Sequence, residues 1–140
     1  MTFRRKPAER AALLSNVEFF QGFSDDDLRR VVELGREVDV PSGAVLVDQG
    51  DPGTSCYVIL SGVANVYVRG EYVASSGPGS MVGEIALLDH RPRTATVIAD
   101  SDLELLEFDS TAFRTLLDEM PKASERVMTL LRARLERSTD

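Results

Sequence analysis

The stretch of sequence with the clearest chemistry covers residues 82–96, which read VGEIALLDHRPRTAT. Two side chains of opposite charge, Glu84 and Arg93, flank a short loop in it. A guanidinium presents a planar fork that fits two oxygens of a phosphate, and a carboxylate accepts hydrogen bonds from a sugar hydroxyl. Because a carboxylate repels a phosphate, Arg93 must face the phosphate while Glu84 faces the sugar. The pair therefore indicates a site for a sugar phosphate.

The backbone around this pair is also suited to an anion. Gly83 lets the chain approach a ligand closely because it has no Cβ. Residues 85–88 can form a single helical turn whose free amide groups face an anion. Pro92 holds the residue before it in an extended conformation and stiffens the approach to Arg93.

The same residues resemble the phosphate-binding cassette of the cyclic-nucleotide-binding domains, a family that includes the catabolite activator protein and the regulatory subunit of cAMP-dependent protein kinase. The shared pattern is Gly-Glu-(Ile/Leu)-(Ala/Gly)-Leu, a short variable loop, and Arg-(Thr/Ser/Ala)-Ala. Residues 83–87 and 93–95 match this pattern. Val82 replaces the common phenylalanine before the glycine, and we expect this to be a modest packing change.

The resemblance implies a role for each residue of the site. Arg93 is expected to bind the phosphate, and Glu84 the ribose 2′-hydroxyl. Thr94 either adds a hydroxyl to the phosphate or purine edge, or is simply a β-branched residue that opens a strand. Val73 and Val82 are expected to line the base. Further contacts are expected from the backbone amides of Gly83, Ile85, Ala86 and Ala95.

The expected ligand is cAMP, with cGMP as the alternative, and no cofactor is expected. A threonine after the cassette arginine is typical of cGMP-dependent kinases, where it contacts guanine. The arginine that those kinases place on the preceding strand would fall near Ala74 here, so the second guanine contact is missing. On the last helix, Arg132 or Arg134 could cap the base, or could be a solvated cation near the helix end.

The middle of the chain consists of short apolar runs separated by turn residues. Strands are expected at residues 38–40, 45–47, 57–60, 63–68, 72–74, 94–99 and 103–108. Glycine, proline, serine and aspartate between these runs mark turns. Many short strands with regular turns favour a sandwich or barrel. The resemblance selects an eight-stranded jelly-roll β-barrel, in a mainly β (α+β) fold with flanking helices.

Helices are expected on both sides of the barrel. Ser24 is suited to cap a helix whose apolar face carries Leu28, Val31 and Val32, and a weaker helix is expected over residues 11–17. A later helix is expected to begin at Asp109 or Ser110 and to present four apolar residues at helical spacing. These are Phe113, Leu116, Leu117 and Met120.

We expect a single domain over residues 1–140, in three parts. Residues 1–36 form an N-terminal helical segment, residues 37–109 form the barrel with its cassette at 82–96, and residues 110–140 form C-terminal hinge or lid helices. The last helix begins at Pro121, a residue that the first helical turn tolerates. Its apolar stripe either covers the barrel or pairs with a second copy in a homodimer. The stripe consists of Val127, Leu130, Leu131 and Leu135.

Composition argues against several classes of protein. The formal net charge of -7 opposes a general electrostatic grip on nucleic acid by this chain alone. One cysteine, Cys56, cannot form an internal disulfide, and a reducing cytoplasm fits it. No segment approaches the roughly 18 apolar residues of a membrane span. The only histidine, His90, has no histidine or cysteine neighbours at metal spacing, so no metal site is expected.

Two kinds of function fit these observations. The first is a regulatory sensor that binds a cyclic nucleotide and signals to an unknown protein effector by re-packing its terminal helices. The second is an interaction module of the same fold whose nucleotide pocket is silent. An enzyme is not expected, because no nucleophile, base and orienting group can be assembled around the cassette. Since the sequence ends soon after the last helix, a sensor without a DNA-binding or kinase segment is expected.

Overall fold

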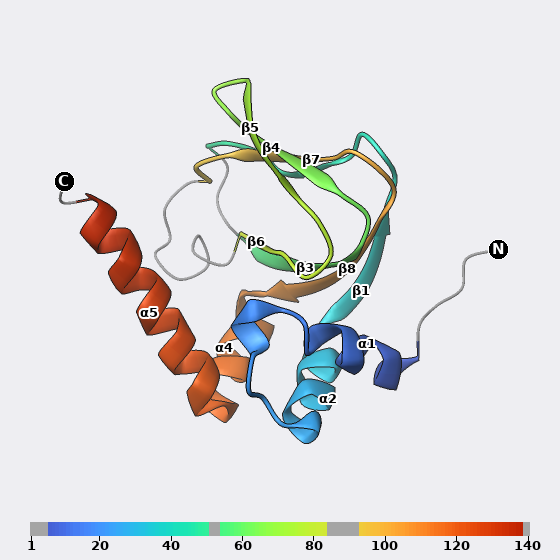
Figure 1. Cartoon of the computed structure of the whole chain (residues 1–140), viewed down its shortest axis with the longest axis vertical. Helices are drawn as coiled ribbons and strands as arrows, with labels where there is room; N and C mark the ends of the chain where they lie inside the picture. The colour runs from blue at the N-terminus through green and yellow to red at the C-terminus, as the bar shows by residue number, and fades with distance from the viewer. Residues whose placement is uncertain (1–5, 51–53, 84–92, 139–140) are drawn as a thin grey trace.

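Two four-stranded antiparallel sheets face each other, and helices cover the outer face of one of them (Figure 1). The structure is a computed structural model that describes residues 6–50, 54–83 and 93–138. The strand orders are β1-β8-β3-β6 and β2-β7-β4-β5. The strands are β1 Arg36–Val40, β2 Val45–Val47, β3 Ser55–Ser61, β4 Ala64–Val68, β5 Glu71–Ser76, β6 Met81–Val82, β7 Thr96–Ala99 and β8 Leu103–Asp109. The expected mainly β jelly roll with flanking helices is confirmed.

Each of the seven expected apolar runs contains a strand, with ends that differ by a few residues. The sequence analysis missed β6, which is only two residues long and pairs with Tyr57 and Val58 of β3. A two-residue strand is too short to show a period of two, so only its pairing identifies it. This strand leads directly into Gly83, the first glycine of the expected site.

Alternating side chains of β3 and β8 divide the core into two layers. Ile59 of β3 and Leu105 of β8 point into the barrel, where they pack with Val47, Ala64 and Val97. The neighbouring residues on the same two strands point to the other face and meet the helices. Those residues are Cys56, Val58, Leu60, Leu106 and Phe108. The central strands β8 and β3 of this sheet are therefore largely buried on both faces, while β1 at its edge is partly exposed.

The N-terminal segment contains α1 (Pro7–Leu14), the short 3₁₀ helix η1 (Glu18–Phe20) and α2 (Asp25–Leu34). The expected helix over residues 11–17 is wrong at both ends, because the helix begins at Pro7, whose fixed φ suits a first turn, and stops at Leu14. The cap at Ser24 is confirmed: its Oγ accepts a hydrogen bond from the Asp27 amide at 3.1 Å.

The C-terminal segment contains α4 (Ser110–Glu119) and α5 (Pro121–Ser138). Asp109 caps α4, since its Oδ1 accepts a hydrogen bond from the Ala112 amide at 2.8 Å. Val127 of the expected α5 stripe is buried and Leu130 is partly buried. The side chains of Leu131 and Leu135 lie outside the described part of the structure. Among the described residues, no helix is long and apolar enough to cross a membrane.

Candidate functional site

Arg93 is the central charged residue of the site, and its side chain is buried in the barrel wall, with 8% of the residue exposed. Its Nη1 donates a hydrogen bond to the carbonyl oxygen of Gly83 at 2.9 Å, and its Nη2 donates one to the carbonyl of Ser55. A buried guanidinium is costly unless such partners satisfy it. Arg93 therefore connects the end of β6 to the beginning of β3.

Gly83 has no side chain, and this allows the guanidinium of Arg93 to lie close to its backbone. Its φ is +86°, a conformation that L residues with a Cβ rarely adopt. A Cβ built at this position would lie 2.2 Å from Nη1 of Arg93. The sequence analysis predicted that Gly83 allows a close approach to a ligand, and the structure shows a close approach to the arginine. The binding role of the Gly83 amide stays a prediction.

A cavity of about 740 Å³ lies beside Arg93. Its lining brings together three residues that the sequence analysis assigned to the site, namely Val73, Arg93 and Thr94. Val73 is 54% exposed on β5, so its apolar side chain is available to a ligand. The rest of the lining was not predicted and comes from the loop after β2 and the β4–β5 hairpin. It consists of Gln49, Val68, Arg69 and Glu71.

Hydrogen bonds tie the loop after β2 to the strand that follows Arg93. Thr96 Oγ1 donates to Asp48 Oδ1 at 2.9 Å and accepts from the Gln49 amide at 2.9 Å. The Gly50 amide donates to the carbonyl of Arg93 at 2.8 Å. The backbone of Arg93 is thus tied to the loop after β2.

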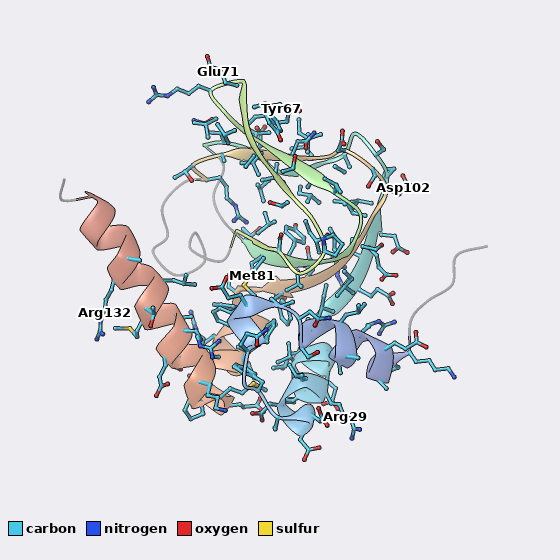
Figure 2. All side chains as sticks on the ribbon, in the orientation of Figure 1. Arg29, Tyr67, Glu71, Met81, Asp102 and Arg132 are labelled. Carbon is cyan, nitrogen blue, oxygen red and sulfur yellow. The ribbon has the colours of Figure 1, made fainter. Side chains whose placement is uncertain are left out.

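Gln49 also joins this loop to the β4–β5 hairpin, because its Oε1 accepts a hydrogen bond from the Arg69 amide at 2.9 Å. Arg69 and Gly70 both have positive φ, at 53° and 79°, as in the type I′ turn of a tight hairpin. The sequence predicts this turn from Arg69-Gly70. Nothing in the sequence indicates that Gln49 contacts the turn. Figure 2 shows Glu71 at the tip of the same hairpin.

One row of side chains crosses the sheet next to Arg93. Arg36, Glu107, Tyr57 and Val82 are in register on β1, β8, β3 and β6. Arg36 donates to Glu107 Oε1 from Nε at 3.0 Å and from Nη2 at 2.6 Å. Burial raises the pKa of the Tyr57 hydroxyl above its ordinary value, and the Glu107 carboxylate acts in the same direction, while the charge of Arg93 opposes them. Arg36 thus pairs with Glu107 at one end of this row.

The other predicted site residues divide into two groups. Val82 is buried among the barrel-interior residues, and Ala95 is partly buried after Thr94. Their binding roles stay predictions. Glu84, Ile85 and Ala86, predicted for the ribose and the phosphate, lie outside the described residues, and so does His90.

Three carboxylates come together away from this cavity, on β1 and β8. Oxygen atoms of Glu37, Asp39 and Glu104 lie within 4.8 Å of one another, a spacing that could hold a metal ion. Arg10 of α1 donates a hydrogen bond to Glu37 Oε2 at 2.5 Å. This group therefore already has a cation among its partners, and the Arg10–Glu37 pair is one contact between α1 and the barrel.

Comparison with known proteins places the chain in a family. Residues 37–120 match the model of the cyclic nucleotide-binding domain, and the chain belongs to that family. A CRP-like cAMP-activated global transcriptional regulator of Mycobacterium tuberculosis is 26% identical over 133 residues, which cover 91% of this chain and 59% of the regulator. The cAMP-dependent protein kinase regulatory subunit of Yarrowia lipolytica is 37% identical over 98 residues, which cover 70% of this chain and 26% of the subunit.

A solved structure supports the same assignment. The catabolite activator protein of Thermus thermophilus superposes with a TM-score of 0.77 at 27% identity, over 86% of this chain and 59% of that protein. This chain thus spans about three fifths of the length of these two bacterial regulators. The family resemblance inferred from residues 83–87 and 93–95 is confirmed.

Proposed function

We propose that this domain binds a cyclic nucleotide through Arg93 and acts as a regulatory sensor. The observation that carries the proposal is the buried guanidinium of Arg93 at the wall of a cavity of about 740 Å³, beside Thr94 and Val73. The position gives a phosphate one buried guanidinium, which can form charge-assisted hydrogen bonds with it. Val73 offers an apolar surface for the purine.

Binding would begin with a competition for the guanidinium. In the structure Arg93 donates to the carbonyls of Gly83 and Ser55. A phosphate oxygen accepts hydrogen bonds better than a carbonyl does, because it carries a negative charge. As Arg93 turns its donors to the phosphate, the Gly83 carbonyl at the end of β6 loses its partner. We propose that Glu84 then binds the ribose, and that the amides of Gly83, Ile85, Ala86 and Ala95 bind the phosphate.

Signalling would follow from a difference in the packing of the terminal helices. A ligand regulates only if it binds one helix arrangement better than another. The sequence continues from the barrel into α4 and α5, so movement of the cassette can be transmitted to that end of the chain. An unknown protein effector would read the change. Because the net charge of the chain is -7, we propose that it does not bind nucleic acid by itself. We also propose that it catalyses no reaction of its own and that it works in the cytoplasm.

We propose cAMP as the ligand rather than cGMP. Ala74 stands where a guanine-binding arginine would be expected, and it cannot contact a base edge by hydrogen bonding. The names of two related proteins specify cAMP, which is a statement about those proteins and supports the same choice here. The alternative ligand is cGMP, because the exposed hydroxyl of Thr94 lies at the cavity and could contact guanine.

The second candidate function is an interaction module with a silent pocket. One observation favours it: both terminal nitrogens of Arg93 already have backbone partners, as expected for an arginine with a purely structural role. Such a module would use the surface of α5, where Met128 is 50% exposed, to pair with a second copy in a homodimer or with another protein.

Calorimetric titration with cAMP and cGMP separates the two candidates. The protein should first be unfolded, washed and refolded to remove any copurified nucleotide, and its fold checked by circular dichroism. We expect micromolar or tighter binding of cAMP, weaker binding of cGMP, and no measurable binding by Arg93→Ala. Arg93→Lys keeps the charge without the fork and should bind weakly. A folded protein that gives no heat with either nucleotide would establish the silent module.

A further inference from the structure

Glu107 of β8 is a carboxylate on the interior face of the barrel, and its side chain is 17% exposed. It shares this face of the strand with Leu103 and Leu105, which pack in the barrel interior. Arg36 of β1 donates to its Oε1 from Nε at 3.0 Å and from Nη2 at 2.6 Å. The Arg36 side chain is 75% exposed, so the pair has its negative end toward the barrel and its positive end toward water.

Strand pairing places Glu107 near the guanidinium of Arg93. Glu107 is directly opposite Tyr57 of β3. Two residues before Tyr57 is Ser55, whose carbonyl accepts a hydrogen bond from Arg93. Two residues of a strand span about 7 Å and neighbouring strands lie about 5 Å apart, so the separation of the two charges is on the order of 10 Å. That is about one Debye length at an ionic strength of 0.1 M, and screening is weaker where protein replaces water.

The hydroxyl of Tyr57 responds to both charges. Burial raises its pKa, the charge of Glu107 and a hydrogen bond with it raise the pKa further, and the charge of Arg93 lowers it. Tyr57 packs against the barrel-interior residues, so it lies on the same side of the sheet as Glu107. The field of Glu107 therefore reaches the part of the barrel in which Arg93 offers its positive charge.

Glu107 can act on a ligand at Arg93 without touching it. The described lining of the Arg93 cavity does not include Glu107, and the carboxylate that it does include, Glu71, is exposed. Water screens an exposed charge strongly, whereas a charge that acts through protein meets a lower effective dielectric constant. In the described part of the chain no carboxylate forms an ion pair with Arg93, since both of its acceptors are backbone carbonyls. Glu107 is thus a fixed negative charge near an arginine that no described carboxylate neutralises directly.

The charge of the ligand determines how strongly Glu107 opposes binding. A cyclic phosphodiester carries one negative charge, whereas a phosphate monoester carries nearly two above its second pKa of about 6. Coulomb repulsion from one fixed charge is proportional to the charge of the ligand. In free energy, Glu107 therefore opposes a 5′-monophosphate about twice as strongly as it opposes the cyclic nucleotide.

We propose that Glu107 is a specificity-determining residue: its charge makes the Arg93 site favour a singly charged cyclic nucleotide over the doubly charged 5′-monophosphate of the same nucleoside. The proposal rests on the proposed function, since it concerns binding at Arg93. Arg93 by itself attracts the dianion more strongly, and Glu107 offsets that advantage. Arg36 limits the effect of Glu107, so that the affinity for the cyclic nucleotide is kept.

The test compares the affinities of cAMP and 5′-AMP at pH 8, with cAMP titrated by calorimetry and 5′-AMP measured by its competition with cAMP. Glu107→Gln removes the charge and keeps an oxygen that can accept from Arg36. We expect it to bind cAMP roughly three times and 5′-AMP roughly ten times more tightly than the parent, because the second factor is about the square of the first. Glu125→Gln, an equal change of charge at an exposed position on α5, should leave both affinities unchanged.

Changes at Arg36 supply a readout that altered packing would not give. Arg36→Met should weaken cAMP binding roughly twofold and 5′-AMP binding roughly fourfold, and Arg36→Lys should restore most of both losses. In protein that already carries Glu107→Gln, Arg36→Met should have no effect on either affinity, because Arg36 acts through Glu107. Since Arg36 is exposed, its variants carry the test if Glu107→Gln does not fold.

The outcomes separate this proposal from the proposed function. If the parent binds cAMP and Glu107→Gln changes both affinities by the same factor, or changes neither, Glu107 does not set specificity and the proposed function stands. The same conclusion follows if 5′-AMP fails to compete in every variant. If the folded parent binds neither nucleotide, the proposed function is wrong and the specificity proposal fails with it.

Discussion

Two arginines of this protein, Arg93 and Arg126, both donate hydrogen bonds to backbone carbonyl oxygens. Arg93 does so in the barrel wall, and Arg126 does so between α5 and the N-terminal segment. Arg93 is buried, and its two carbonyl partners belong to β3 and to the end of β6. Arg126 is partly exposed and binds carbonyls of the short η1 segment. The contacts of Arg93 are part-buried and two of the three contacts of Arg126 are exposed, so water replaces a lost partner more easily at the helix contact.

The difference suggests a division of roles. A buried cation whose alternatives are all costly keeps one position until a stronger acceptor arrives, and this is what a phosphate site requires. Breaking the contact of a surface cation costs little free energy, so such a contact can open and close. The comparison thus predicts that the contacts of Arg126 open more readily than those of Arg93.

The largest expected effect comes from removing the buried guanidinium. Arg93→Met removes the donors to the part-buried carbonyls of Gly83 and Ser55, and a polar group left unsatisfied away from water costs roughly 1 to 3 kcal/mol. We expect the free energy of unfolding, measured in urea, to fall by about 2 to 4 kcal/mol. Arg126→Met should lower it by less than half as much. A fall of equal size in both variants would contradict the contrast between the two sites.

A second substitution examines the fit of Gly83 to Arg93. Gly83→Ala places a Cβ on a residue with φ of +86° and 2.2 Å from Nη1 of Arg93. Gly43→Ala is the matched control, because Gly43 has φ of +89° and no heavy atom within 4 Å of the added Cβ. Backbone strain of order 1 to 3 kcal/mol applies to both. We expect a larger fall in the melting temperature for Gly83→Ala, and similar falls would show that Arg93 adjusts freely.

The smallest expected effect concerns an exposed ion pair between two helices. Arg30 of α2 donates to both oxygens of Glu119 at the end of α4, at 2.9 Å each. Hydrogen bonding with Arg30 lowers the pKa of the Glu119 carboxyl below the ordinary value of 4.5. Since the folded pKa is the lower one, the pair stabilises the protein above that value and is lost as pH falls through the folded pKa.

The pH dependence of unfolding measures this pair. Glu119→Gln should reduce the melting temperature slightly at neutral pH and make no difference in acid, where Glu119 is protonated in both states. Added salt should shrink the difference, because both side chains are about two-fifths exposed. A difference that persists in acid would mean that Glu119 acts through packing and not through its charge.

Much of the fold could be predicted because it depends on local patterns. Ser24 was identified as a cap and Asp109 was one of two cap candidates with Ser110; Ser24 and Asp109 accept the expected backbone hydrogen bonds. The longer strands were visible as apolar runs between turn residues. The two-residue β6 was not, since its existence depends on β3 lying beside it.

The site was predictable in part. The match at residues 83–87 and 93–95 identified the family and singled out Arg93 and Gly83 from the sequence alone. The sequence could not show that Arg93 binds the Ser55 carbonyl, because a backbone oxygen carries no residue-specific signal. For the same reason it gave no sign that Gln49 reaches the Arg69 amide, or that Arg126 reaches η1.

By itself, the sequence determined the chemical character of this protein: an acidic domain of short strands and flanking helices, with one arginine in a phosphate-binding pattern. Residue types, spacing and turn propensities carry that information because they act over a few neighbouring positions. Only the tertiary structure decided which carbonyls each arginine binds and which of them is buried. These contacts form only where segments far apart in the chain meet in space. Burial then determines how much each contact contributes to the free energy of folding.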